Sequence, residues 1–223
     1  MKAKVLVPET LSEITLGQYQ KFLKISDENK NSLFLQQKMI EIFCNIDLKQ
    51  VMNMKYNSIT KITNHLNTLF EQKPTFIPTF KNGDLEFGFI PKLDDMTFGE
   101  YVDLDTTIAN WEDMHKAMGV LFRPIDYKKK DKYIIEQYES YEKYTMKEMP
   151  LDIVLGSLVF FWNLSKELMI HIPNYFKSEM QNLSLQQKQT LEENGGGIQA
   201  YTQLVEEACY SLMKLQDNPY TNV

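Results

Sequence analysis

One motif occurs twice in this sequence and predicts how two helices begin. Leu11-Ser-Glu-Ile-Thr-Leu-Gly-Gln-Tyr19 aligns without gaps to Leu93-Asp-Asp-Met-Thr-Phe-Gly-Glu-Tyr101. In each copy a threonine stands three residues before Gln or Glu, which is the capping-box pattern of a helix N-terminus. The flanking apolar residue and the tyrosine form a hydrophobic staple. We therefore expect helices capped by Thr15 with Gln18 and by Thr97 with Glu100.

The repeat is open to two interpretations. Unrelated helices can begin with similar sequences, because helix capping requires the same residue types each time. Alternatively a helical unit is duplicated, with residues 35–44 echoed by 111–122. Under both interpretations the repeated Thr-x-Gly-x-Tyr initiates a helix and is not a ligand site.

Helical spacing of apolar residues continues along the chain and predicts a mainly α fold. Apolar residues recur at intervals of three and four in 35–43, 59–70 and 113–122, and an aromatic-rich stripe follows at 134–141. The most apolar segment, 151–172, is expected to be the central helix of a bundle.

The segment from about 75 to 90 changes to the alternating period of β-strands. Asn82-Gly83 is the strongest short hairpin signal, because a type I′ turn needs positive φ at both central residues. With these two residues in the turn, Phe80 pairs with Leu85. Pro78 cannot donate to a β-ladder, so its strand is expected at an edge. The predicted apolar face carries Phe76, Pro78, Phe80, Leu85, Phe87 and Phe89.

These elements predict one mainly helical domain over 1–223, a length that a single domain can reach. Two candidate sub-units, 10–73 and 92–172, would flank the hairpin at 75–90. C-terminal helices would follow at 184–215.

Charge and composition exclude several classes of function. The chain has 24 basic and 30 acidic residues, and Arg123 is its only arginine. Since arginine is preferred for phosphates and base edges, sequence-specific nucleic-acid binding is not expected. The longest apolar run, 153–162, has about half of the ~20 residues that a membrane span needs. The N-terminus also lacks a signal peptide, so we expect a protein of the cytosolic type with no membrane partner.

No constellation of residues predicts a chemistry. Phosphate-binding loops, nucleophile elbows and paired-histidine motifs are missing from the sequence, so no catalytic, cofactor-binding or metal-binding residue is expected. Cys44 and Cys209 stand alone and are expected to be reduced core thiols. The basic run 128–132 is interpreted as a solvated surface or a site for an acidic partner.

An acidic cluster leaves two alternatives open. The cluster would either bind a divalent cation through its carboxylate oxygens or interact favourably with the dipole of the helix that follows it. An enzyme built from scattered residues would centre on Asp94, Asp95, Glu112 and His115. The cluster comprises Asp94, Asp95, Glu100, Asp103 and Asp105.

Three segments of the sequence resemble a known group of proteins. They are residues 87–105 (FGFIPKLDDMTFGEYVDLD), 118–125 (MGVLFRPI) and 155–164 (LGSLVFFWNL). They look like small helical proteins encoded among the virion genes of tailed bacteriophages, with those of the crAss-like phages of Bacteroides as the nearest comparison. The likeness covers about residues 10–215. It implies a non-catalytic structural, cargo or assembly protein that joins the virion after assembly in the host cytoplasm, and it carries over no functional residues.

Contact with other virion proteins is therefore the expected function. We also expect a homo-oligomer, because an edge hairpin can accept a strand from a neighbour. The alternatives are an assembly chaperone or a host-directed binding module that is absent from the finished particle. The residues expected to contact partners are Phe76, Phe80, Phe87, Phe89, Tyr138, Tyr141 and Tyr144.

The single arginine is expected to have a structural role. Arg123 follows the helix predicted over 113–122, where a cation suits the helix C-terminus. Because arginine is so scarce here, we expect a buried or interfacial carboxylate partner from the acidic cluster.

Overall fold

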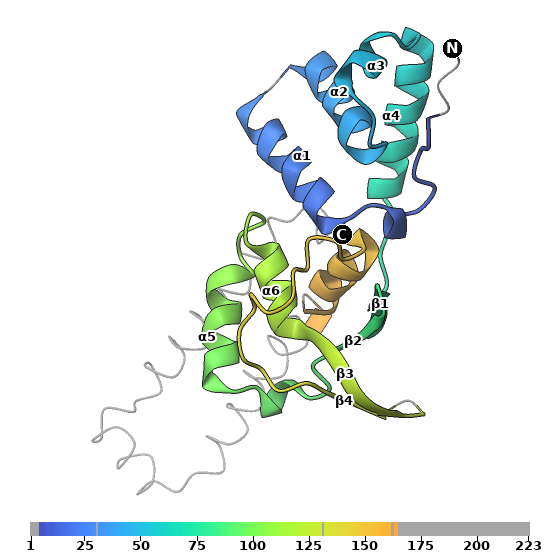
Figure 1. Cartoon of the computed structure of the whole chain (residues 1–223). Helices are drawn as coiled ribbons and strands as arrows, with labels where there is room; N and C mark the ends of the chain where they lie inside the picture. Colours follow the sequence, from blue (N-terminus) through green and yellow to red (C-terminus); the bar gives the residue numbers. More distant parts are fainter. Residues whose placement is uncertain (1–4, 30, 131, 162, 165–223) are drawn as a thin grey trace, which may run out of the picture. The chain divides into compact units, whose positions relative to one another are not determined.

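The computed structural model describes residues 5–29, 31–130, 132–161, 163 and 164 (Figure 1). The chain divides into two units, Met1–Ser157 and Leu158–Val223, and nearly all described residues belong to the first. The boundary falls within the predicted sub-unit 92–172. The helices predicted at 184–215, the end of the helix predicted over 151–172, and Cys209 lie outside the described residues.

Helices form most of the regular structure of the first unit, and a small antiparallel sheet accompanies them, so the mainly α prediction is confirmed at this level. A helix over 151–161 follows the last strand. In chain order the named elements are η1 (Leu11–Glu13), α1 (Leu16–Glu28), α2 (Ser32–Phe43), α3 (Leu48–Met52), α4 (Tyr56–Phe70), β1 (Thr79–Asn82), β2 (Leu85–Phe89), η2 (Leu93–Asp95), α5 (Phe98–Thr107), α6 (Met114–Leu121), β3 (Phe122–Lys129) and β4 (Lys132–Ile135).

The first four helices pack around α2, which contacts α1, α3 and α4. Aromatic rings form part of this core, and the Phe43 ring lies 5.2 Å from Phe70 and 5.3 Å from Phe22. Cys44 is buried at the end of α2 with Ile40. Burial raises the pKa of the Cys44 thiol to about 11, so it stays protonated at neutral pH.

A later segment of the chain covers the start of α1. The Leu16 N–H donates to the Met149 carbonyl at 2.9 Å, and the Gly17 N–H donates to the Lys147 carbonyl at 2.7 Å. These bonds satisfy two of the donors that every helix N-terminus leaves unpaired. Thr15 also forms an isolated β-bridge with Pro150. Residues 147–150, which begin in a turn, therefore act as a cap over this helix end.

The four strands form one antiparallel sheet in the order β1-β2-β3-β4. Its first strand, β1, is an edge strand as predicted, and Pro78 immediately precedes it. The predicted hairpin is thus half of a sheet, because β2 pairs with β3 of the same chain.

The turn and register of the first hairpin differ from the prediction. Gly83 and Asp84 are the turn residues, so Phe80 pairs with Phe87 instead of Leu85. Gly83 has a φ of 61° and Asp84 does not have a positive φ, which is the pattern of a type II′ turn with glycine first. Because the register moves by two residues, the side chains that share a face are unchanged.

The second hairpin differs from the prediction in its second strand, where a helix was expected. The helix predicted over 113–122 ends at Leu121, and β3 begins with the next residue. The helix predicted over 134–141 is wrong, because this stretch is β4 followed by an irregular segment. Short apolar runs fit both periods. Pairing of β3 with β2 and of β4 with β3 decides for strand here. In the basic run, Lys128 and Lys129 end β3 and Lys132 begins β4, and Lys130 after β3 has a φ of 54°.

The helix over 151–161 is buried through its first two turns, and Leu151, Val154 and Leu155 are fully covered. A Cβ placed on Gly156 would lie 2.3 Å from the Thr75 carbonyl oxygen, so this helix passes directly against the segment before β1. Within the described part of the chain, every helix is too short or too polar to cross a bilayer.

Replacing Gly156 with alanine tests this close approach. We expect Gly156→Ala to lower the free energy of unfolding by about 1–3 kcal/mol, because the methyl group meets backbone that cannot rotate away. Gly99→Ala in α5 is the matched control, since a Cβ there meets nothing within 4 Å. It should be neutral or raise stability by up to about 1 kcal/mol. Urea unfolding followed by circular dichroism measures both, and equal stabilities would contradict the packing.

Candidate functional site

A buried ion pair joins α5 to the sheet. Arg123 on β3 and Glu100 in the first turn of α5 approach to 2.6 Å between Nη2 and Oε1, and their side chains are 11% and 4% exposed. The other carboxylate oxygen of Glu100 accepts a hydrogen bond from the Thr97 N–H at 2.6 Å. Glu100 therefore closes the predicted capping box and neutralises the single arginine with one side chain.

Both predicted capping boxes are present. Thr15 and Gln18 exchange hydrogen bonds of 2.9 and 3.2 Å, and Thr97 and Glu100 do the same. The expected carboxylate partner of Arg123 is also present within the acidic cluster. Arg123 follows the C-cap of α6, as expected, and it also lies in β3 opposite Gly88, which was not predicted.

Tyr138 extends this polar centre. Its ring centroid lies 5.6 Å from the Arg123 guanidinium carbon, a cation–π contact. Its hydroxyl donates to Asp103 Oδ2 at 2.5 Å, and Asp103 lies one turn after Glu100 on α5. Burial and then this bond raise the pKa of Tyr138, so the hydroxyl remains a donor. Two contacts thus fix the inner side of α5.

Fixing the inner side of α5 leaves an apolar outer side exposed. Glu100, Leu104 and Thr107 are buried, whereas Phe98 is 82% and Tyr101 is 58% exposed. The exposed residues lie at helical spacing, so they form one stripe on the surface. We call this surface the α5 outer face. It comprises Phe98, Tyr101 and Val102, flanked by the exposed carboxylates Asp94, Asp95 and Asp105.

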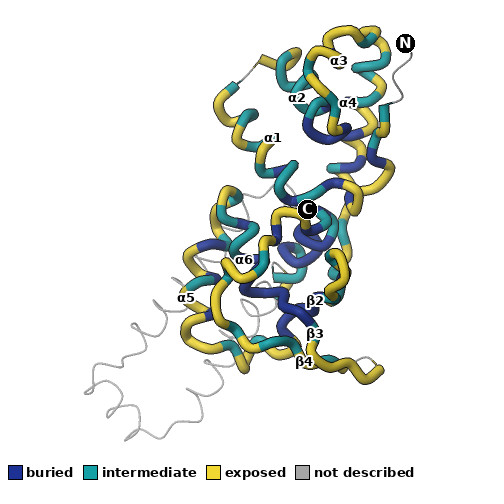
Figure 2. Tube along the Cα trace, viewed as in Figure 1, coloured by how far each residue is buried: buried dark blue, intermediate teal, exposed yellow. Residues whose placement is uncertain are grey.

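A second exposed surface lies at the turn of the β3–β4 hairpin. Tyr127 and Ile134 are cross-strand partners, and both are largely exposed. Four lysines surround them, of which Lys128 forms an ion pair with Glu86. We call this surface the β3–β4 tip; it comprises Tyr127, Lys128, Lys129, Lys130, Lys132 and Ile134. Figure 2 shows the end of this hairpin as exposed.

The residues predicted to contact partners lie elsewhere. Phe80, Phe87 and Phe89 are buried, so the prediction that they form a partner surface is wrong. The reason is that this apolar face packs inside the protein, where the Phe80 and Phe89 rings contact Phe122 and the Phe87 ring contacts Tyr144. Phe76 is half-buried with its ring 5.0 Å from Phe89.

The three predicted partner tyrosines do not share a helix face. Tyr138, Tyr141 and Tyr144 are half-buried in the irregular segment that follows β4. The Tyr144 hydroxyl donates to Glu136 at 2.9 Å, and the ring lies 5.5 Å from Phe87. Their aromatic character serves packing inside the unit.

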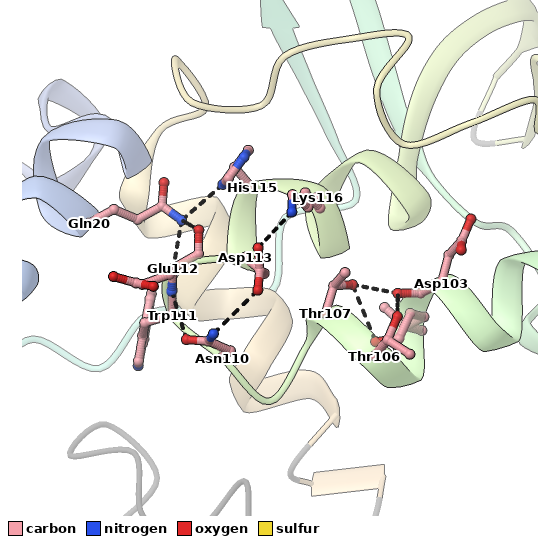
Figure 3. A network of polar contacts seen from close by, with 11 residues as sticks. Gln20, Asp103, Thr106, Thr107, Asn110, Trp111, Glu112, Asp113, His115 and Lys116 are labelled. Carbon is pink, nitrogen blue, oxygen red and sulfur yellow. Dashed lines mark hydrogen bonds and ion pairs between the residues drawn. The ribbon is translucent and has the colours of Figure 1, made fainter.

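A polar network around His115 ties α1 to the start of α6 (Figure 3). The Gln20 amide nitrogen donates to the Trp111 carbonyl at 2.6 Å and lies 3.1 Å from His115 Nδ1. Burial, followed by Lys147 and Lys116, lowers the pKa of His115. A neutral imidazole can accept the Gln20 hydrogen bond at Nδ1, whereas an imidazolium cannot.

The structure does not bring the scattered acidic residues and His115 together. Asp94 and Asp95 precede α5, whereas Glu112 and His115 follow it, and ten helical residues span about 15 Å. Among the described residues, no group of three or more His, Cys, Asp or Glu side chains is arranged to hold a metal ion.

The comparisons with known proteins assign no family. No protein-family model, no curated protein and no solved structure matches this chain.

Sequence reasoning missed both exposed surfaces. The signal for the α5 outer face was present in the second copy of the helix-start motif, where Phe98 and Tyr101 lie on the side of the helix away from Glu100 and Leu104. The β3–β4 tip carried no comparable signal, because β3 depends on pairing with β2 and β4 depends on pairing with β3.

The buried ion pair can be separated from the capping box by one substitution. Glu100→Gln keeps an oxygen for the Thr97 N–H but leaves the Arg123 charge unpaired. We expect a loss of about 3–5 kcal/mol in the free energy of unfolding. Thr97→Ala, which keeps the ion pair, should cost only about 1 kcal/mol. Chemical denaturation measures both.

The double variant Glu100→Gln with Arg123→Met is the control for the unpaired charge. It should recover part of the loss, because no buried charge remains. A Glu100→Gln variant no less stable than Thr97→Ala would show that the pair adds nothing beyond the cap.

Stability should fall on mild acidification through His115. Its pKa is lower in the folded than in the unfolded state, so its contribution is complete above the unfolded pKa of about 6.5 and is lost as the pH falls below it. We expect the stability difference between the wild type and His115→Gln to shrink from pH 7.5 to pH 5. Urea midpoints of both proteins over this range test it. A constant difference would exclude the effect.

Proposed function

We propose that this protein is a non-catalytic structural, cargo or assembly component of a tailed-phage virion that acts by binding other virion proteins. The resemblance of residues 87–105, 118–125 and 155–164 to virion proteins of crAss-like phages suggests the setting. The α5 outer face is the observation that carries the binding role. A largely exposed phenylalanine with two apolar neighbours at helical spacing is typical of an interaction site.

The way α5 is held suits this role. Its first turn is closed by the capping box, and its inner side is fixed by the Arg123–Glu100 pair and the bond from Tyr138 to Asp103. A surface that is already ordered loses less conformational entropy on binding than a flexible one. Phe98 and Tyr101 are residue types enriched at interface cores.

We also infer that the helical unit is duplicated and that the helices form one bundle. In support, each copy of the motif forms a three-residue 3₁₀ turn, a capping box and a helix, in η1 with α1 and in η2 with α5. Each of these helices packs on the next long one, α1 on α2 and α5 on α6. The proposed location is the virion, reached after assembly in the host cytoplasm.

Incorporation into virions tests the proposal. Phe98→Ser with Tyr101→Ser removes the α5 outer face, and we expect at least tenfold less of this variant than of wild type in purified particles, as measured by quantitative mass spectrometry. Met52→Ser with Tyr56→Ser is the matched control, because these residues are similarly exposed on other helices. It should incorporate like the wild type.

Two outcomes would contradict the proposal. Particles that lack the protein while infected cells contain it would favour an assembly chaperone or a host-directed module. Equal incorporation of the two double variants would remove the α5 outer face from the binding role.

A further inference from the structure

The two copies of the helix-start motif differ in what covers them. Leu16 in the first copy is 0% exposed and Tyr19 is 5% exposed, whereas the equivalent Phe98 and Tyr101 lie largely in solvent. A Cβ on Gly17 would lie 3.1 Å from the Lys147 carbonyl, whereas a Cβ on Gly99 would meet nothing within 4 Å. The same sequence pattern is therefore buried in the first copy and exposed to solvent in the second.

The first copy shows what kind of cover the motif accepts. The segment 147–150, which begins in a turn, supplies backbone carbonyls to the N–H groups of Leu16 and Gly17. Apolar rings complete the contact, since Tyr19 lies 5.1 Å from Trp111 and 5.7 Å from Phe70. The cover is therefore a non-helical segment that offers backbone carbonyls, with apolar side chains beside it.

The second copy also differs from the first in the charge of its flanking residues. This charge indicates which kind of segment would bind to it. Asp94, Asp95 and Asp105 flank the α5 outer face, so a basic segment would be attracted to it. The chain beyond residue 164 has more acidic than basic residues and does not complement this face. The β3–β4 tip does, because its lysines surround an exposed apolar pair.

The tip also offers backbone groups that are unpaired in the sheet. Its strand β4 is the last in the sheet order, so one of its edges is not paired within the sheet. Figure 1 shows the end of this hairpin away from α5, so the two surfaces of one molecule are separate patches. A second copy can therefore bring its tip to the α5 outer face of the first.

We propose that the α5 outer face binds the β3–β4 tip of a second copy of this chain. The proposal rests on the proposed function and names a partner for the same surface. Tyr127 and Ile134 pack on Phe98 and Tyr101, and the lysines face the flanking carboxylates. Because the two patches differ, the contact is heterologous and leaves one free patch at each end, so it generates a ring or a filament.

Sedimentation velocity over a concentration series at low salt tests the contact on the full chain. The wild type should show species larger than 26.2 kDa. Phe98→Ser with Tyr101→Ser should weaken self-association at least tenfold. The double variant Lys129→Glu with Lys132→Glu should weaken self-association to the same extent. These two residues are cross-strand partners, so the variant reverses the sign of the charge but keeps like charges opposite each other in the hairpin. Raising the salt to 0.5 M should also weaken association, because screening reduces contacts between exposed charges.

A mixture of the two double variants gives the decisive result. Each variant retains one intact patch, so the mixture should form a species of two copies and nothing larger. Met52→Ser with Tyr56→Ser and Lys61→Glu with Lys73→Glu are the controls for lost apolar area and for changed charge, and both should associate like the wild type. Circular dichroism of every variant verifies that the fold is kept.

Three results would overturn the proposal. A wild type that remains a single copy at every concentration would exclude self-contact, and binding of other virion proteins would then be judged from the incorporation experiment alone. Variants that assemble like the wild type would show self-association through another surface. A mixture that forms no two-copy species would show that the two patches do not bind each other.

Discussion

The position of α5 depends on the ion pair between Arg123 and Glu100. The pair connects a strand to the first turn of a helix at 2.6 Å and is nearly excluded from solvent. An unpaired charge in this buried position would be strongly destabilising, so separating the two side chains would lower the free energy of unfolding. Tyr138 covers the guanidinium and binds Asp103 on the same helix. The orientation that results sends Glu100 inward and Phe98 outward, and it therefore determines which face of α5 meets the solvent.

Local features of the fold could be predicted because they depend on neighbours in the sequence. Both capping boxes follow from residues three positions apart, and their hydrogen bonds form as expected. The grouping of Phe80, Phe87 and Phe89 on one face also follows from strand periodicity. The exact register does not, because Gly83 can supply positive φ at either central position of a two-residue turn. The partner of Arg123 was predicted from the scarcity of arginine, although its place in a strand was not.

The features that could not be predicted depend on contacts between distant parts of the chain. Phe122, Arg123 and Pro124 form part of a strand because β2 lies beside them, and no local signal distinguishes this run from the end of a helix. The presence of β3 beside β2 also affects whether the aromatic face of the first hairpin is exposed. An isolated hairpin would expose Phe87 and Phe89, whereas here they are buried and their rings contact Tyr144 and Phe122. An error about one strand therefore moved the predicted partner surface to the wrong residues.

The repeated motif shows why a local signal determines a helix but not a function. Thr15 with Gln18 and Thr97 with Glu100 start their helices in the same way, with the same bonds. What differs is the cover that arrives from elsewhere: residues 147–150 lie over the first helix start, and the second remains exposed. Exposure of a pattern that the same chain otherwise buries is a stronger sign of an interface than exposure alone, because the buried copy shows that the surface can be packed. The proposed binding role of α5 thus rests on a comparison within the molecule, in which one copy of the motif is covered and the other is exposed.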